Sequence, residues 1–224
     1  MSAPDYGAAF RLWRAATPGW QAYTHHAFVE GLRTGDLPRA QFLHYLRQDY
    51  IFLIHFARAW ALAVTKAETL AEMQTAAAIM QALVRDEMPL HLRICAKEGI
   101  NAAALAATQE APANLAYTRY VLEAGYSGDF LDLMAALAPC VLGYGEIGAR
   151  LAGHGGPYAE WIETYAGTEY QALCHDVGAL IDDSLVHRLG PDWADLPRFT
   201  RLARHFDMAT RLEADFWQMG LAGE

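Results

Sequence analysis

Residues 129–152, DFLDLMAALAPCVLGYGEIGARLA, form the stretch that decides the fold. The stretch is rich in alanine and leucine and has the apolar spacing of a helix. In its middle, Cys140 follows a proline and precedes two glycines that bracket Tyr144. Proline removes a hydrogen bond from a helix interior and glycine costs backbone entropy, so stability alone does not explain this choice. The question is whether Cys140 packs a core or performs chemistry.

Helical periodicity continues through the rest of the chain, and no segment alternates with the period of two that a β-strand shows. Thr17 before Pro18 predicts one helix start, and Pro38 and Pro112 predict two more, because proline fits the first turn of a helix. The predicted helices are residues 18–35, a long helix from 38 past 60, 68–98, 112–124, 129–152, 158–166, 168–189 and 196–219. Pro89 is expected to kink the third of these or to tighten a turn in it.

The helices and the composition predict an all-α protein that forms a single domain, residues 1–224. About eight or nine helices are too many for a simple four-helix bundle. The chain is 54% hydrophobic, which is ample for one core. Its formal net charge of −9 offers no basic surface for a nucleic acid or an anionic membrane.

The cellular location is predicted from three features of the sequence. The first fourteen residues lack a basic leader followed by an apolar run, so we expect no signal peptide. The longest apolar run, residues 133–145, is too short to span a bilayer. The three cysteines are odd in number and form no CxxC pair, which predicts free thiols in the reducing cytoplasm.

Three predicted helices carry a titratable residue where the period calls for an apolar one. Asp49 lies in an apolar stripe of the long helix, Cys140 lies on the inner face of residues 129–152, and Glu213 lies on the aromatic face of the last helix. A buried carboxylate is costly unless it is hydrogen-bonded or protonated. Taken singly, Cys140 could be a small core residue, Asp49 could pair with Arg47, Arg58 or a neighbouring helix, and Glu213 could face a subunit interface or pair with an arginine. Together they suggest a polar pocket inside the bundle.

Five segments, in order, resemble the TenA or thiaminase II family: FLHYLRQDYIFLIHFARAWALAVTKA, DEMPLHLRICAKEGI, PCVLGYGEIG, WIETYAG and EADFWQM. The resemblance implies the haem-oxygenase-like all-α fold, a homotetramer, and no metal or cofactor. It also implies a small-molecule substrate: 4-amino-5-aminomethyl-2-methylpyrimidine, or thiamin, would be hydrolysed to the 5-hydroxymethyl pyrimidine in thiamin salvage.

The resemblance also implies site residues. Cys140 matches the nucleophile that adds to the pyrimidine ring, Asp49 matches the carboxylate that holds the ring's amino group and adjacent nitrogen, and Glu213 matches the acid that handles a ring-nitrogen proton and the leaving group. The matching substrate-binding residues are Tyr117 and Phe216 as aromatic walls, Tyr144 and Tyr165 as hydroxyl groups near the thiol and the reacting carbon, and Phe52. We expect that Pro139 and the glycines around Tyr144 let a ligand approach the helix closely.

Phe52 is the departure from the family's pattern, because many members carry a tyrosine three residues after the aspartate. The missing hydroxyl puts the rate and the preferred leaving group in question. It also keeps open an alternative, a non-catalytic pyrimidine-binding or regulatory protein in which Cys140 is only a ligand contact.

A second alternative is a metal-dependent oxygenase or oxidase on the same fold. Glu87 and His91 share a helix face, and Glu146 and His175 could add to a ligand set, but the position one turn beyond His175 is Ala179. His25 or His26 could ligate a haem iron, although adjacent histidines more often lie on the surface or pair with other side chains in the core. The basic pocket that a PQQ-type oxidase needs is not evident in the sequence.

Overall fold

The computed structural model describes residues 4–154 and 156–223 of the chain. Within these residues every regular element is a helix, so the predicted all-α class is confirmed. The α-helices are α1 (Ala8–Ala16), α2 (Trp20–Thr24), α3 (Ala27–Thr34), α4 (Arg39–Lys66), α5 (Leu70–Ala82), α6 (Met88–Lys97), α7 (Ala102–Ala106), α8 (Pro112–Ser127), α9 (Phe130–Leu151), α10 (Ala159–Ala166), α11 (Thr168–Leu189) and α12 (Pro197–Ala222). A π-helical turn (Leu83–Glu87) joins α5 to α6, and a 3₁₀ turn (Trp193–Asp195) precedes α12.

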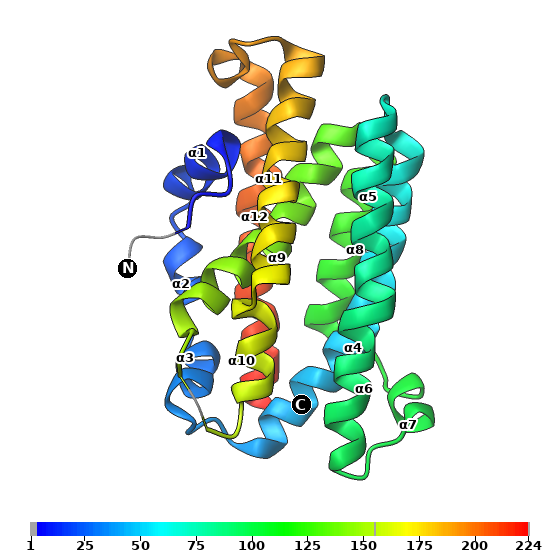
Figure 1. The fold of residues 1–224 in the computed structure, drawn as a ribbon, viewed down its shortest axis with the longest axis vertical. Helices are drawn as coiled ribbons and strands as arrows, with labels where there is room; N and C mark the ends of the chain where they lie inside the picture. The colour runs from blue at the N-terminus through cyan, green and yellow to red at the C-terminus, as the bar shows by residue number, and fades with distance from the viewer. Residues whose placement is uncertain (1–3, 155, 224) are drawn as a thin grey trace.

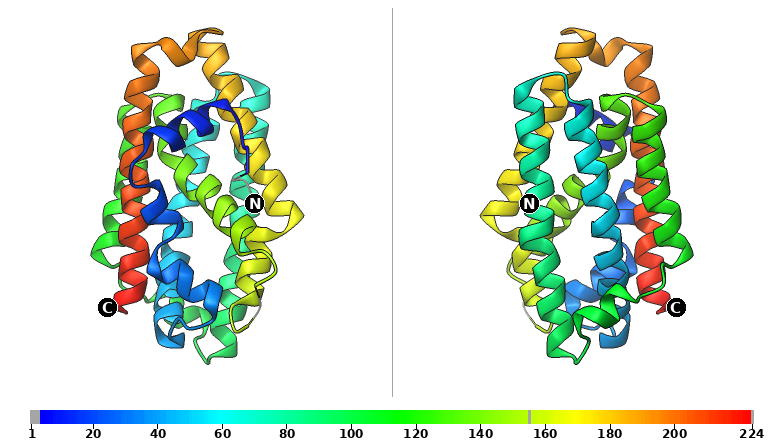
Figure 2. Two further views of the ribbon diagram at one scale, coloured as in Figure 1. Left: turned by 90° about the vertical axis from the view of Figure 1, so that its left-hand side faces the viewer. Right: turned by 90° about the vertical axis from the view of Figure 1, so that its right-hand side faces the viewer.

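Helix α9 lies at the centre of the bundle, packed against α4, α8, α10, α11 and α12 (Figures 1 and 2). Nearly all of its residues are buried. By length and composition alone α9 could cross a membrane, but its apolar window lies wholly inside the fold. Its apolar character is therefore that of a core helix.

Local interactions fix the start of α9. The Asp129 side chain accepts hydrogen bonds from the backbone N–H groups of Leu131 (2.9 Å) and Asp132 (3.2 Å). The Asp132 side chain in turn accepts one from the Asp129 N–H (2.9 Å), which completes a capping box. Arg198 of α12 ion-pairs with both carboxylates, so the cap also ties α9 to the last helix.

The glycines around Tyr144 have a different purpose from the one expected. A side chain at Gly143 would overlap the ring of Tyr23, and one at Gly145 would overlap Tyr6 and the sulfur of Cys174. The expectation that these glycines admit a ligand is therefore wrong. They admit side chains of α2, α11 and the N-terminal segment, and so let α9 be packed tightly on several sides.

The helix boundaries predicted from the sequence are largely confirmed for α4 and α8 to α12. The predicted first helix is instead divided into α2 and α3, because the ring of His26 accepts the Phe28 N–H (3.2 Å) and starts a new helix there. Helices α1 and α7 were not predicted. The described residues therefore contain more helices than the eight or nine expected.

The segment around Pro89 contradicts the tightened turn, which was one of the two outcomes predicted for it. The turn before it is widened and not tightened, since the Met88 N–H bonds to the carbonyl of Leu83, five residues back. Proline has no N–H, and its ring clashes with the carbonyl four residues earlier, here that of Arg85. A π-helical turn relieves that clash, and turns of this kind are frequent at functional sites.

Candidate active site

A cavity of about 250 Å³ opens between α4, the π-helical turn, α6, α9, α10 and α11. Four predicted site residues line it: Asp49, Cys140, Tyr144 and Tyr165. The apolar part of the lining consists of Leu53, Phe56, Ile79, Ala82, Leu83, Leu90, Val141 and Leu173. The other polar lining residues are Asp86, Glu87, Arg93, Thr164, Glu169 and Tyr170.

The opening of the cavity is marked by the lining residues that solvent reaches. Asp86, Arg93 and Glu169 are exposed, whereas Asp49 and Cys140 are buried. The cavity therefore has an inner end, at the thiol, and a charged rim formed by the π-helical turn, α6 and the start of α11.

Asp49 is held by a neighbouring helix and by its own. Its Oδ2 oxygen accepts a hydrogen bond from the Tyr45 hydroxyl (3.0 Å) and lies 2.6 Å from Nε2 of His91 on α6. Both contacts involve Oδ2, so Oδ1 is the oxygen left for a ligand in the cavity. Of the two pairings considered from the sequence, an arginine or a neighbouring helix, the neighbouring helix is the one that holds Asp49.

The fully buried imidazole of His91 holds the side chain of Asp49 in one orientation. Its Nδ1 lies 3.0 Å from the Glu87 backbone carbonyl, which can only accept, so Nδ1 carries a proton. Burial by itself lowers the pKa of His91, but the hydrogen bond and charge of Asp49 outweigh it and raise the pKa above its ordinary value. The raised pKa favours the doubly protonated imidazole, which donates to Asp49 and to the Glu87 carbonyl.

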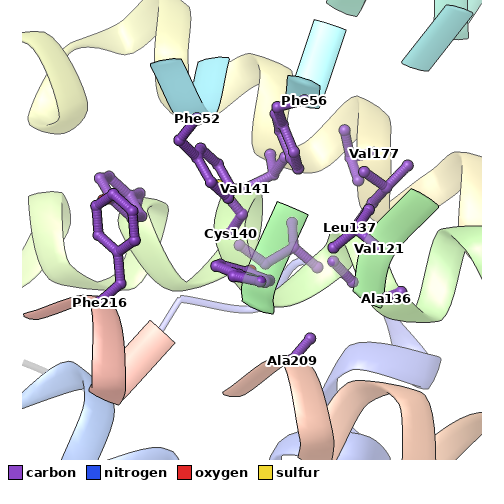
Figure 3. Close-up of a cluster of buried hydrophobic side chains, with 14 of the residues drawn as sticks. Phe52, Phe56, Val121, Ala136, Leu137, Cys140, Val141, Val177, Ala209 and Phe216 are labelled. Carbon is purple, nitrogen blue, oxygen red and sulfur yellow. The ribbon is translucent and has the colours of Figure 1, made fainter. Parts of the chain in front are cut away.

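Cys140 is a protonated thiol at rest. Burial, followed by the negative charges of Glu213, Glu87 and Asp49, raises its pKa well above the ordinary value of a cysteine. Figure 3 shows it inside an apolar cluster beside Phe52 and Val141, with Phe216 and Ala209 of α12 nearby. A nucleophilic role for this thiol would require a group that takes its proton during attack.

Glu213 lies in α12 behind Cys140 and does not line the cavity itself. Its Oε1 accepts a hydrogen bond from the Tyr117 hydroxyl (2.8 Å). Burial raises its pKa to about 8, and the charge of Asp49 acts in the same direction, while the hydrogen bonds from Tyr117 and Cys140 oppose it. Glu213 is thus a mostly protonated acid at neutral pH, next to the thiol.

The predicted aromatic walls form a cluster behind the cavity. The ring of Phe52 lies 4.9 Å from that of Tyr117 and 5.4 Å from that of Phe216, centroid to centroid. None of the three lines the cavity in this structure. They surround Cys140 and Glu213 with apolar surface, and the absence of a hydroxyl on Phe52 keeps this side of the thiol apolar.

The two predicted hydroxyl groups have different partners. The Tyr144 hydroxyl lies 3.3 Å from that of Tyr45, which links it to Asp49. The Tyr165 hydroxyl donates to Oε1 of Glu87 at 2.7 Å. Their rings are packed edge to face with centroids 5.0 Å apart.

Sequence reasoning did not assign Tyr45, Glu87 and His91 to this site. Tyr45 precedes Asp49 by one turn, and Glu87 and His91 are four residues apart, so each shares a helix face with a residue that was recognised or considered. That spacing was the available signal. The contact of Glu87 and His91 with the site depends on how this part of the chain packs against α4, which the sequence does not reveal.

The side chains considered as ligands of a metal or haem are not gathered in one place. Among residues 4–154 and 156–223, no group of three or more His, Cys, Asp or Glu side chains is arranged to hold a metal ion. Glu146 is bound by Arg14 (2.7 Å) and by the indole of Trp20 (3.1 Å). The ring of His175 packs on Tyr6, and His26 caps α3.

The chain is similar to known proteins over nearly its whole length. The family model described as TENA/THI-4/PQQC matches residues 13–223. The chain belongs to the TENA/THI-4/PQQC family. The resemblance to the TenA family is thereby confirmed.

Similar proteins come from bacteria and yeast. A solved structure from Silicibacter sp. TM1040, described as a TenA family transcription regulator, is 60% identical with a TM-score of 0.94 and covers 96% of this chain and 97% of that one. An aminopyrimidine aminohydrolase of Halalkalibacterium halodurans is 35% identical over 94% of each chain. A hydroxymethylpyrimidine/phosphomethylpyrimidine kinase of Saccharomyces cerevisiae is 31% identical over 92% of this chain and 38% of that longer protein. The aminohydrolase name, which relatives from Helicobacter pylori and Bacillus subtilis share, supports the prediction that this family member is an enzyme of the thiaminase II type.

Proposed function

We propose that the chain hydrolyses an aminopyrimidine at its exocyclic methylene carbon. The substrate would be 4-amino-5-aminomethyl-2-methylpyrimidine, or thiamin, and the product the 5-hydroxymethyl pyrimidine used in thiamin salvage. The observation that carries the proposal is one cavity in which the Cys140 thiol and the Asp49–His91 pair meet, with the acid Glu213 beside the thiol.

Asp49 would bind the ring. An aminopyrimidine presents an amino group next to a ring nitrogen, and a carboxylate can accept from the amino group and from the protonated nitrogen. The contacts of Tyr45 and His91 with Oδ2 hold this carboxylate in one orientation and leave Oδ1 to the ligand. Charge-assisted hydrogen bonds of this kind fix the ring relative to the thiol.

Cys140 and Glu213 would perform the addition. Glu213, protonated at neutral pH, donates its proton to a ring nitrogen and makes the ring electrophilic. The resulting carboxylate accepts the thiol proton while the Cys140 sulfur forms a bond to the ring carbon next to the one that bears the methylene.

Expulsion and hydration would follow. The electrons of the adduct expel the amine, whose C–N bond pair leaves with nitrogen, and an exocyclic methylene remains. Water adds to this methylene and passes a proton to the released amine. The carbon–sulfur bond then breaks with its electron pair going to sulfur, which takes back the thiol proton from Glu213, and the ring nitrogen returns its proton to Glu213, which restores the aromatic ring and the resting acid.

The test is an assay of ammonia and 5-hydroxymethyl pyrimidine release from the aminomethyl pyrimidine by the purified chain. Equal amounts of the two products, lost in Cys140→Ser and kept in Cys174→Ser, would support the proposal. Binding of the pyrimidine without release of either product would overturn it.

The second candidate is a protein that binds the pyrimidine and regulates without turnover. Phe52 favours it, because the hydroxyl that many relatives carry there is missing. The same assay separates the two, since this candidate predicts affinity without ammonia release.

We also propose that the chain acts in the cytoplasm as a homo-oligomer, a tetramer by resemblance to the family. Exposed apolar side chains such as Leu70 (68% exposed) and Tyr126 (71%) support a further association surface. Light scattering coupled to size exclusion tests the state, and a monomer at micromolar concentration would refute it.

A further inference from the structure

Glu87 is a carboxyl group in the cavity that the proposed reaction does not use. It ends the π-helical turn, and its side chain lines the cavity together with Cys140 and Asp49. Its Oε1 accepts the Tyr165 hydroxyl at 2.7 Å, which holds the carboxyl toward the cavity between α6 and α10. The helix is thus distorted at the residue whose carboxyl enters the site, as is frequent for π-helical turns at functional sites.

The charges around Glu87 leave its carboxyl without an ion-pair partner among the described residues, although the charge of His91 acts on it from a distance. The groups that face it are the Asp49–His91 pair, the Tyr165 hydroxyl and the Cys140 thiol. The charge of His91 is directed to Asp49 at 2.6 Å. No Lys, Arg or His side chain of the described residues forms an ion pair with Glu87. A carboxyl group in a cavity with one neutral donor is suited to a ligand that brings positive charge.

The position of Glu87 also fits the path of the leaving group. Glu213 does not line the cavity, whereas Glu87 lines it together with Cys140 and directly follows Asp86 of the exposed rim. A group expelled from the methylene carbon must leave through that opening. Glu87 is a partly exposed carboxyl that lines the cavity next to that rim.

We propose that the Glu87 carboxylate binds the ammonium group of the substrate's aminomethyl substituent and thereby selects the amine as leaving group. The inference rests on the proposed function and specifies it. An ammonium group offers N–H donors, whereas the quaternary nitrogen of thiazolium offers none. The bound ammonium leaves as ammonia, because the electron pair of the C–N bond goes to nitrogen and no proton has to be supplied.

The test compares two ligands that differ only in this substituent. Calorimetry measures the affinity of the 5-aminomethyl and 5-hydroxymethyl pyrimidines for a Cys140→Ser background, which prevents turnover, with and without Glu87→Gln. We expect Glu87→Gln to weaken the aminomethyl ligand about tenfold or more, because a charge-assisted contact is lost, and to leave the hydroxymethyl ligand within about twofold. The matched control is Glu163→Gln, which removes the same charge from an exposed position of α10 that does not line the cavity.

Equal weakening of both ligands, or of neither, would overturn the inference and leave the proposed function standing. Failure of both ligands to bind while Glu87 is intact would overturn the proposed function and the inference with it. Circular dichroism checks that Glu87→Gln folds. If it does not, Tyr165→Phe removes the hydroxyl that orients Glu87. That variant should weaken the aminomethyl ligand selectively by about threefold, and an equal loss for both ligands would again overturn the inference.

Discussion

Cys140 and Cys174 are two buried thiols, one in helix α9 and one packed against that helix, and their surroundings differ. Cys140 belongs to α9 and lines the cavity, while Cys174 belongs to α11, donates to the carbonyl of Val141 (3.4 Å) and packs beneath Gly145. Burial raises the pKa of both. Only Cys140 has carboxyl groups around it, and only Cys140 faces open space. Burial therefore does not distinguish a reactive thiol from a packed one; the neighbouring proton carriers and the access to a ligand do.

The strongest test exchanges each sulfur for oxygen. Cys140→Ser should lower kcat on the order of 10³-fold or more and keep pyrimidine affinity within about tenfold, because the sulfur acts chiefly in the transition state. Cys174→Ser should retain turnover within about threefold, as expected of a residue outside the cavity. Steady-state ammonia release and ligand titration measure both, and comparable losses in the two variants would erase the distinction.

The next test removes the proton carrier beside Cys140. Glu213→Gln keeps the shape of the side chain but cannot exchange a proton, so kcat should fall about 10²- to 10⁴-fold with a smaller change in affinity. Since Glu213 has a pKa of about 8 and acts as an acid, the parent rate should decline as pH rises through about 8. A pH–rate profile measures this. A variant with the parent rate and profile would make Glu213 a structural acid.

A smaller effect, on KM, is expected from removing His91, which orients Asp49. His91→Gln should raise KM about tenfold, because Asp49 loses a charge-assisted bond that orients it. The pKa of His91 is raised in the folded protein, so its contribution to stability is full below its ordinary value of 6.5 and is lost as pH rises through the folded value.

Urea unfolding of the parent and of His91→Gln, measured from below pH 6.5 to above the folded pKa of His91, checks the sign of this dependence of stability on pH. The difference in stability between the two should shrink as the solution becomes more alkaline. Tyr45→Phe removes the other donor to the same oxygen and is the matched variant for KM. An unchanged KM in both variants would show that Asp49 does not hold the ligand.

The smallest effect on turnover should come from the Cys174 side of α9. Gly145→Ala places a methyl group against Cys174 and Tyr6, so we expect a loss of about 1–3 kcal/mol in unfolding free energy. Ammonia release per folded molecule should stay near that of the parent. Thermal unfolding and the ammonia assay together measure both, and a large loss of kcat at unchanged stability would mean that Gly145 serves the reaction.

The contrast between the two thiols was partly predictable from the sequence. Asp49, Cys140 and Glu213 interrupt apolar helical faces, and this pattern can be recognised from the sequence without any knowledge of tertiary structure. The roles of Glu87 and His91 depend on the contact between α6 and α4, which no local spacing encodes. The glycines around Tyr144 could be recognised as unusual, but their neighbours Tyr23, Tyr6 and Cys174 come from distant parts of the chain.

In the fold, too, the features set by local sequence could be predicted and the features set by contacts between distant residues could not. Proline marked the starts of α4 and α8, and helical periodicity gave the lengths of these helices and of α9. Helix α1 was missed because its preceding residue, Gly7, provides no side-chain cap, and the break between α2 and α3 depends on one histidine ring. Periodicity alone also could not distinguish a widened turn before Pro89 from a tightened one.

That widened turn fixes the rotational phase between α5 and α6. Each residue of an α-helix advances the side-chain direction by about 100°, so the additional residue in the π-helical turn rotates everything after it by that amount relative to a regular helix. This offset brings the buried residues of α5, Ala76 and Ile79, and the pair of Glu87 and His91 to the same side of the helix. If the same five residues formed a regular α-helical turn, α6 would be rotated by about that amount and the pair would be turned away from that side. The backbone conformation of this segment, and not only its side chains, is therefore part of what defines the site.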